Sequence, residues 1–233
     1  MMGDPMKTTS PVRRLALAVG VISVLLSAAG RSAAGESGDI PGYPQHVTSY
    51  DPREVSLLPK FCTYTQLFRD HVPGGNNPVE IERWHDIMGP VFIHMHHYCY
   101  GLMYLHRANA LARDPIIRGY NYNFALNEFD YTLERTPSDF PLLPEMLTMR
   151  GEVLMHQGRA GQAQEAFERA ISLKPDYWAP YAFWSDQLVK TGDLVQARAV
   201  LEKGLAQAPD SVGLHRRLTD LDAEKPKNKS ASQ

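Results

Sequence analysis

The fold is decided by PEMLTMRGEVLMHQGRAGQAQEAFERAISLKP (residues 144–175) and by its second copy, WAPYAFWSDQLVKTGDLVQARAVLEKGLAQAP (residues 178–209). Each copy has, in order, a large, a small and a large side chain, then glycine, then a small, a large and a small side chain, then proline. The matching positions are separated by one constant offset: Leu147, Gly151, Leu154, Gly158, Ala163, Phe167, Ala170 and Pro175 in the first copy, and Tyr181, Ser185, Leu188, Gly192, Ala197, Leu201, Gly204 and Pro209 in the second. Such a fixed period indicates a repeated structural unit.

Each copy predicts a pair of antiparallel helices. The first three matching positions lie on one face of a helix, and so do the fifth to seventh. Gly158 and Gly192 stand where the first helix would end in a left-handed residue, and Asp193 is placed to cap the helix that follows. Pro175 and Pro209 would then end the second helices. One hairpin alone cannot bury its apolar face, so we expect the hairpins to stack.

These positions and their spacing resemble the tetratricopeptide repeat, whose unit is a pair of antiparallel helices. The resemblance implies an all-α fold, an α-solenoid of about three antiparallel helix hairpins with a capping helix. It also implies an adaptor that binds a protein or peptide. The segments LPKFCTYTQ (residues 58–66) and HMHHYC (residues 94–99) resemble those of exported bacterial members of this family, of uncharacterised function.

Residues 1–34 are predicted to be a signal peptide. Lys7, Arg13 and Arg14 precede an apolar run over residues 15–26, and the small residues of Ser32-Ala33-Ala34 follow it. The run is shorter than the roughly 20 apolar residues that span a bilayer, which disfavours the alternative of an uncleaved anchor. We therefore expect export to the periplasm or secretion, by the general or the twin-arginine route.

From residue 35 onward the chain divides by composition and pattern. We expect an N-terminal arm and short helix in residues 35–78, a degenerate first repeat with an elongated first helix in 79–143, repeats at 144–177 and 178–211, a capping helix at 212–224 and a disordered tail at 225–233. The short helix is expected over residues 56–68. In the degenerate repeat, the first helix is expected over residues 91–111 and its partner over residues 122–135.

Composition restricts the function. The whole chain has 24 Lys and Arg against 26 Asp and Glu, and residues 1–34 hold four of the basic residues and one of the acidic residues. The cleaved chain is therefore acidic, with 20 basic and 25 acidic residues, which argues against binding to nucleic acid. No second apolar run reaches membrane length, so we expect no membrane span in the mature chain. No nucleophile elbow, phosphate loop or paired-carboxylate pattern is present, so we predict no enzymatic activity and no cofactor.

A histidine cluster offers an alternative function. His94, His96 and His97 lie within one helical stretch beside Cys99, and residues three apart on a helix share a face, where two ligands could reach one metal ion. The patterns of a metalloprotease helix and of a c-type haem site are both missing. We favour a structural role for the cluster, and the alternative is a small periplasmic protein that binds a metal or another ligand there.

Cys62 and Cys99 are the only cysteines, and both follow the predicted signal peptide. An even pair in an exported chain favours a disulfide, which would tie the segment around residue 62 to the first helix of the stack. Two separate buried thiols remain the alternative.

The resemblance also places a partner-binding groove on the first helices of the repeats. Carried over by position, the groove is lined by Tyr98, Leu102, Thr148, Met149, Glu152, Met155, Ala182, Phe183 and Asp186. These side chains are mostly apolar and include two acids, which predicts an apolar or basic peptide segment as ligand. Family members that bind a carboxylate line this face with Lys, Arg and Asn, which we do not expect here. Alternatively, the N-terminal arm and the long first helix fill the groove.

Overall fold

The computed structural model describes residues 50–229, with side chains to residue 223, and this range contains helices and no strand. The predicted signal peptide, most of the arm and residues 230–233 lie outside it. The elements are α1 (Pro52–Val55), η1 (Lys60–Tyr64), α2 (Phe68–His71), α3 (Pro78–Met88), η2 (Gly89–His94), α4 (Met95–His106), η3 (Arg107–Leu111), α5 (Pro115–Leu133), α6 (Leu143–His156), α7 (Ala160–Leu173), α8 (Ala179–Lys190), α9 (Leu194–Gln207) and α10 (Val212–Lys229). Within this part of the chain, no helix is long and apolar enough to cross a membrane.

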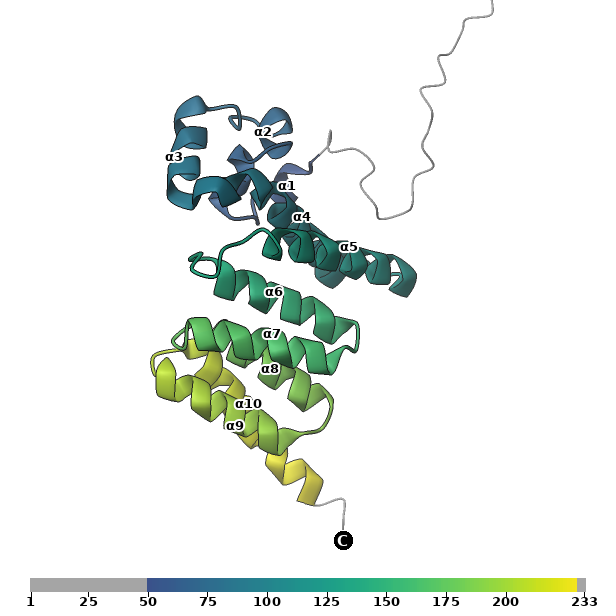
Figure 1. Cartoon of the computed structure of the whole chain (residues 1–233). Coiled ribbons are helices and arrows are strands. Elements are labelled where there is room, and N and C mark those ends of the chain that lie inside the picture. The colour runs from purple at the N-terminus through teal and green to yellow at the C-terminus, as the bar shows by residue number, and fades with distance from the viewer. Residues whose placement is uncertain (1–49, 230–233) are drawn as a thin grey trace, which may run out of the picture. The chain divides into compact units, whose positions relative to one another are not determined.

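The helices pack as successive hairpins. α4 pairs with α5, α6 with α7 and α8 with α9, and α10 packs against α9 and α8. Neighbouring hairpins contact one another through α5 with α6 and through α7 with α8 (Figure 1). The fold is therefore all-α, a stack of the helix hairpins that the repeat predicted.

The predicted helix ends are confirmed. Gly158 and Gly192 have positive φ angles of 72° and 83°, the left-handed conformation that glycine adopts without a steric penalty. Asp193 caps α9, because its carboxylate accepts a hydrogen bond from the backbone N–H of Gln196 at 3.0 Å.

The small and large repeat positions fit into one another across each hairpin. A Cβ atom added to Gly151 would lie 2.5 Å from Cε1 of Phe167, and one added to Gly101 would lie 2.4 Å from Cε1 of Phe129. Both phenylalanines are fully buried. The rings therefore lie directly on the helix backbone opposite, in space that a side chain would otherwise fill. In the third hairpin the small residue is Ser185, whose hydroxyl donates to the carbonyl of Ala182 at 2.8 Å.

The first hairpin departs from the prediction in both helices. The expected single helix over residues 91–111 is three consecutive segments: the 3-10 helix η2, α4, and the π-helical turn η3. Gly89, at a φ of 60°, and Pro90 mark where this run begins after α3.

The partner helix begins at Pro115, seven residues before its predicted start. Its first residues were predicted to be loop. Asp114 caps the helix by accepting hydrogen bonds from the N–H groups of Ile116 and Ile117, and Pro115 occupies the first helical position, where its missing N–H costs nothing. The sequence Asp-Pro is a helix start that the prediction overlooked.

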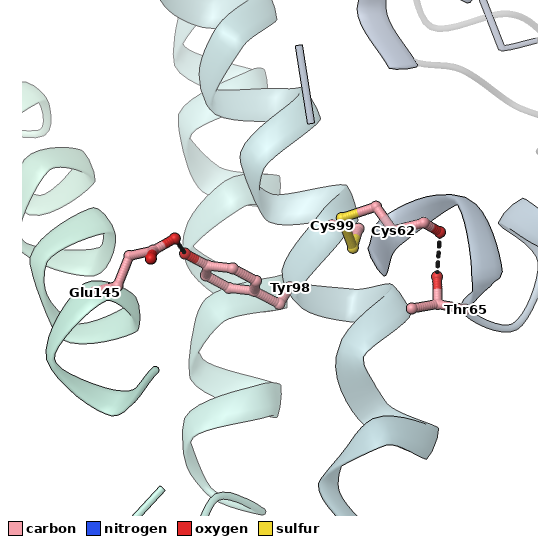
Figure 2. Close-up of a disulfide and its surroundings, with 5 residues drawn as sticks. All are labelled: Cys62, Thr65, Tyr98, Cys99 and Glu145. Atoms are coloured by element: carbon pink, nitrogen blue, oxygen red, sulfur yellow. Dashed lines mark hydrogen bonds between the residues drawn. A yellow bond between two sulfur atoms is a disulfide. The ribbon is translucent and has the colours of Figure 1, made fainter. Parts of the chain in front are cut away.

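Before α4, the segments η1 and η2 pack against α4, and α3 packs against η1 and η2. The expected helix over residues 56–68 is the 3-10 turn η1 between two single-turn helices. A disulfide joins Cys62 of η1 to Cys99 of α4, as predicted, and Thr65 donates to the carbonyl of Cys62 at 2.8 Å (Figure 2). Glu54 accepts two hydrogen bonds from Arg107, at 2.6 and 2.5 Å.

The last helix is longer than predicted. α10 runs to Lys229, whereas the capping helix was expected to end at residue 224. Leu214 and Leu221 are buried, while most of the other side chains between residues 212 and 223 are partly or fully exposed. One apolar edge against α9 and a polar outer surface are what a terminal cap requires.

The close contact between Gly151 and Phe167 makes a testable prediction. Gly151→Ala should lower the free energy of unfolding by about 1–3 kcal/mol, because its methyl group overlaps the ring. The matched control is Gly119→Ala in α5, where an added Cβ has nothing within 4 Å. That change should be neutral or stabilise the helix by up to about 1 kcal/mol. Urea unfolding followed by circular dichroism measures both, and equal stabilities would show that the helices do not approach this closely.

Loss of the disulfide should be costly. The bond closes a loop of 37 residues, so Cys62→Ala with Cys99→Ala should lower the free energy of unfolding by about 3–4 kcal/mol in the chain-entropy description. As a control, a reductant should lower the urea midpoint of the original chain and leave the midpoint of the double variant unchanged. Two free thiols in the oxidised protein, detected by alkylation and mass spectrometry, would rule out the bond.

Candidate functional site

A pocket with a volume of ≈ 630 Å³ lies between η3, the first turns of α5, and the C-terminal halves of α6 and α8. We call it the Glu152 pocket. Its lining residues are Ala108, Asn109, Arg118, Tyr122, Glu152, Met155, His156, Phe183, Asp186 and Lys190. Its volume falls within the roughly 300–1,000 Å³ of ligand-binding pockets.

The predicted groove coincides with this pocket only in part. Of the predicted residues, Glu152, Met155, Phe183 and Asp186 line it. The remaining predicted residues are fully buried (Tyr98, Thr148 and Ala182) or half-buried outside the pocket lining (Leu102 and Met149). Near α4, the predicted groove residues are therefore buried in contacts between helices instead of lining an open pocket.

Tyr98 shows why the face closes at α4. Its ring lies between Phe61 of η1 and Phe129 of α5, with centroids 6.5 and 5.6 Å away. Its hydroxyl donates to Glu145 of α6 at 2.7 Å (Figure 2). The segment η1 thus covers α4 at Tyr98, while the surface over α6 and α8 stays open.

A chain of polar contacts crosses the Glu152 pocket. The hydroxyl of Tyr122 donates to Oδ1 of Asn109 at 2.7 Å, and Nδ2 of Asn109 donates to Oε1 of Glu152 at 2.9 Å. Nε2 of His156 lies 3.9 Å from the same carboxylate oxygen, and its ring stacks on that of Tyr122 with centroids 4.6 Å apart. The π-helical turn η3 therefore contributes directly to the pocket, through Asn109.

Burial shifts the protonation of this cluster. It raises the pKa of the Glu152 carboxyl, and the hydrogen bond from Asn109 opposes the shift only in part. Burial also lowers the pKa of His156, with the positive charges of Lys190 and Arg118 acting in the same direction. The two pKa shifts favour the neutral forms of Glu152 and His156. Titratable groups perturbed in this way within a pocket are typical of binding sites.

The acids of the pocket already have partners. Asn109 donates to Glu152, and Arg217 of α10 donates to both carboxylate oxygens of Asp186 at 2.9 Å. Lys190 makes no hydrogen bond or ion pair with any residue between 50 and 223. The guanidinium of Arg118 donates to the carbonyl of Ala112 at 3.0 and 3.2 Å and is exposed. The charge available to a ligand is therefore positive.

A second, smaller pocket continues the same surface toward α10. Its volume is ≈ 300 Å³. It shares Asp186 and Lys190 with the Glu152 pocket. We call it the Arg217 pocket. It lies between α8, α9 and α10, with Leu201 and Leu221 among its lining residues. Together the two pockets span the open part of the face formed by the first helices.

Comparison with known proteins identifies the repeats. A family model for the tetratricopeptide repeat matches residues 154–231. The chain therefore contains tetratricopeptide repeats in this region. It is also similar to protein O-mannosyl-transferase TMTC1 of Mus musculus, with 31% identity over 98 residues. That match covers 42% of this chain and 10% of the relative, so the chain spans about a tenth of that protein's length. Tetratricopeptide repeats are scaffolds for protein–protein interaction and are typically non-catalytic.

One prediction about the tetratricopeptide groove is wrong. Lys, Arg and Asn side chains were expected to be missing from the face, yet Lys190, Arg118 and Asn109 all line the Glu152 pocket. Asn109 and Arg118 come from η3 and the early turns of α5, which have no counterpart in the standard repeat unit. The repeat register could not place them on this face.

His156 and Lys190 could have been found from the sequence. They occupy equivalent positions in the two repeats, and each follows a predicted groove acid, Glu152 or Asp186, by one helical turn. Residues four apart on a helix lie on the same face. Extending the groove by one turn in the tetratricopeptide register would have included both.

The histidine cluster packs between α4 and α5. Nδ1 of His96 lies 2.9 Å from the carbonyl oxygen of Ile93, and Nδ1 of His97 lies 2.5 Å from Oε2 of Glu128. The His97 ring also contacts the ring of Tyr131, with centroids 3.8 Å apart, and His94 meets the edge of that ring. Across the described side chains, no group of three His, Cys, Asp or Glu residues is placed to hold a metal ion. The geometry gives the metal-binding alternative no support.

The raised pKa of Glu152 predicts a pH-dependent stability. A carboxyl whose pKa is higher in the folded state stabilises the protein most when protonated, and that contribution is lost as the pH rises through the folded pKa. Glu152→Gln keeps an acceptor for Asn109 without the buried charge, so it should raise the urea midpoint at pH 7.5 and change it less at pH 4. The control is Glu165→Gln on the exposed face of α7, which should shift neither midpoint. A lower midpoint for Glu152→Gln at pH 7.5 would contradict the effect of burial.

Proposed function

We propose that this protein is an exported scaffold that binds a segment of a protein partner in the cell envelope, through the Glu152 and Arg217 pockets. The observation that carries the proposal is the charge of the Glu152 pocket. The two acids that line it accept hydrogen bonds within the chain, and Lys190 and Arg118 line the same pocket. A ligand that supplies an anionic group gains the most from this arrangement.

The apolar lining defines the rest of the ligand. Phe183 is half-buried on α8, and Met155 and Tyr122 are buried beside it with small exposed fractions. A flexible methionine next to aromatic rings accommodates apolar side chains of several shapes. We therefore propose an extended segment with an apolar side chain over Phe183 and an acidic side chain next to Lys190. The sequence predicted an apolar or basic segment, and the basic choice assumed that Glu152 and Asp186 were free.

The N-terminal segment limits where the partner binds. Phe61 and the disulfide hold η1 over α4, so the ligand lies over α6, α8 and α10. The shared residues Asp186 and Lys190 make the two pockets one continuous surface in this direction. A segment several residues long fits such a surface better than a single side chain does.

Two features support export. Residues 1–34 have the charged start, apolar run and small residues of a signal peptide. The Cys62–Cys99 disulfide belongs to the class of bond that persists in oxidising compartments such as the periplasm. The partner is then a protein of the same compartment.

We propose a role without catalysis. The support is the usual function of tetratricopeptide repeats and the chemistry of the Glu152 pocket, where both acids already accept hydrogen bonds from Asn109 and Arg217. The transferase relative shares with this chain only a tenth of its own length, and its activity is not transferred here.

A displayed peptide library tests the proposal. The chain from residue 37, which lacks the predicted signal peptide, would be panned against random peptides. Enriched peptides should combine an acidic residue with a large apolar residue a few positions away. Phe183→Ala with Lys190→Glu should lower their affinity by about a hundredfold, because each change removes one of the two recognised features, each worth about 1.4 kcal/mol or a factor of ten.

The control for the panning is Val195→Ser, a change on α9 at a side chain that is 84% exposed and outside both pockets. It should leave the enriched peptides and their affinities unchanged. The circular dichroism of both variants should match that of the original chain. Equal binding by the folded double variant, or enrichment of basic peptides, would refute the proposed ligand.

A further inference from the structure

The tip of the first hairpin exposes a cluster of large apolar side chains. We use hairpin tip for residues 110–120, which comprise the end of η3, the connection and the first turns of α5. Leu111, Ile116 and Tyr120 are 57%, 67% and 46% exposed. Ile116 and Tyr120 are four residues apart on α5 and therefore share a face. Single exposed apolar residues are ordinary, but three gathered at one tip are not.

The hairpin tip projects past the neighbouring hairpin. α6 ends at His156, and the side chain of Gln157 donates to Oδ1 of Asn123 at 2.8 Å. Asn123 is thus level with the end of α6, and the eight residues of α5 before it continue roughly 12 Å further at 1.5 Å per residue. Figure 1 shows this end of α5 extending beyond α6. The apolar residues therefore lie on a projection.

The charge of the hairpin tip is positive. Arg113 and Arg118 are exposed. The single acid, Asp114, is engaged as the cap of α5, where its carboxylate accepts the N–H of Ile116 at 2.7 Å. Aliphatic side chains, a tyrosine and arginines next to one another are the composition of a surface that enters the interface of an anionic membrane.

The small size of the hairpin tip favours a membrane over a protein as its binding partner. A stable protein interface buries about 800 Å² and roughly 20–30 residues on each side, and the short tip falls well below that. A bilayer needs no complementary shape and accepts a small convex projection. This favours a lipid surface over a second copy of the chain or another protein.

We infer that the hairpin tip is a peripheral membrane-docking site that inserts Leu111, Ile116 and Tyr120 among anionic lipids, with Arg113 and Arg118 at the headgroups. The contact is reversible, because it involves three side chains and no spanning helix. It would hold the pockets near the bilayer surface, since Arg118 lines the Glu152 pocket as well as the tip.

Vesicle flotation tests this inference. The chain from residue 37, which lacks the apolar run of residues 15–26, would be mixed with vesicles of phosphatidylcholine alone or with about 30% phosphatidylglycerol, at about 0.1 M salt, where surface charges still interact over ~10 Å. It should float with the anionic vesicles and much less with the neutral ones. Leu111→Ser with Ile116→Ser should reduce the floated fraction at least fivefold, and Arg113→Glu should reduce it as well.

Val195→Ser is the matched control, because it replaces an exposed apolar side chain elsewhere. It should float like the original chain. The variants change exposed side chains, and their circular dichroism establishes that they fold. No flotation of the original chain, equal flotation with neutral vesicles, or full flotation of the folded double variant would each overturn the inference. A tip variant that binds vesicles normally but loses a protein partner would instead make the tip a protein-binding surface.

Discussion

The structure depends on the close approach of paired helices at a glycine. Gly101 lies against the ring of Phe129, and Gly151 lies against the ring of Phe167. Each contact places an aromatic ring on the backbone of the opposite helix and so sets the distance between the two helices of a hairpin. Because both rings are fully buried, any side chain at the glycine would displace them. The hairpins then stack through their remaining faces, and the first helices come to lie side by side.

The candidate functional surface lies where the repeats become irregular. In a regular stack, Glu152 of α6 would lack the hydrogen-bond donor that Asn109 provides. The first hairpin continues past the standard length through the π-helical turn η3, and this turn brings Asn109 onto Glu152. At the other end, α10 supplies Arg217 to Asp186, the repeat equivalent of Glu152. Both acids are thus satisfied by elements outside the two regular repeats. Lys190, which follows Asp186 by one turn, is left facing the open pocket.

The sequence predicted the regular repeats and missed the irregular elements. The repeat period located α6 to α9 and the ends of their first helices at Gly158 and Gly192. It could not locate η3, because a π-helical turn has no periodic pattern of its own, and it placed residues 115–121 in a loop although Asp114-Pro115 begins a helix. The groove was misjudged at Tyr98 for a related reason. Only the fold brings Phe61 and Glu145 to its two ends, and a repeat position gives no indication of a segment that covers it.

The central claim is that the elongated first hairpin forms one wall of the Glu152 pocket through Asn109, and a double-mutant cycle between Asn109 and Glu152 tests it most directly. The free energy of unfolding at neutral pH would be measured for Asn109→Ala, Glu152→Ala, both changes together and neither. A hydrogen bond to a partly buried carboxylate predicts a coupling energy of about 1–3 kcal/mol between the two side chains. A coupling energy below about 0.3 kcal/mol, the value expected for independent sites, would contradict the account.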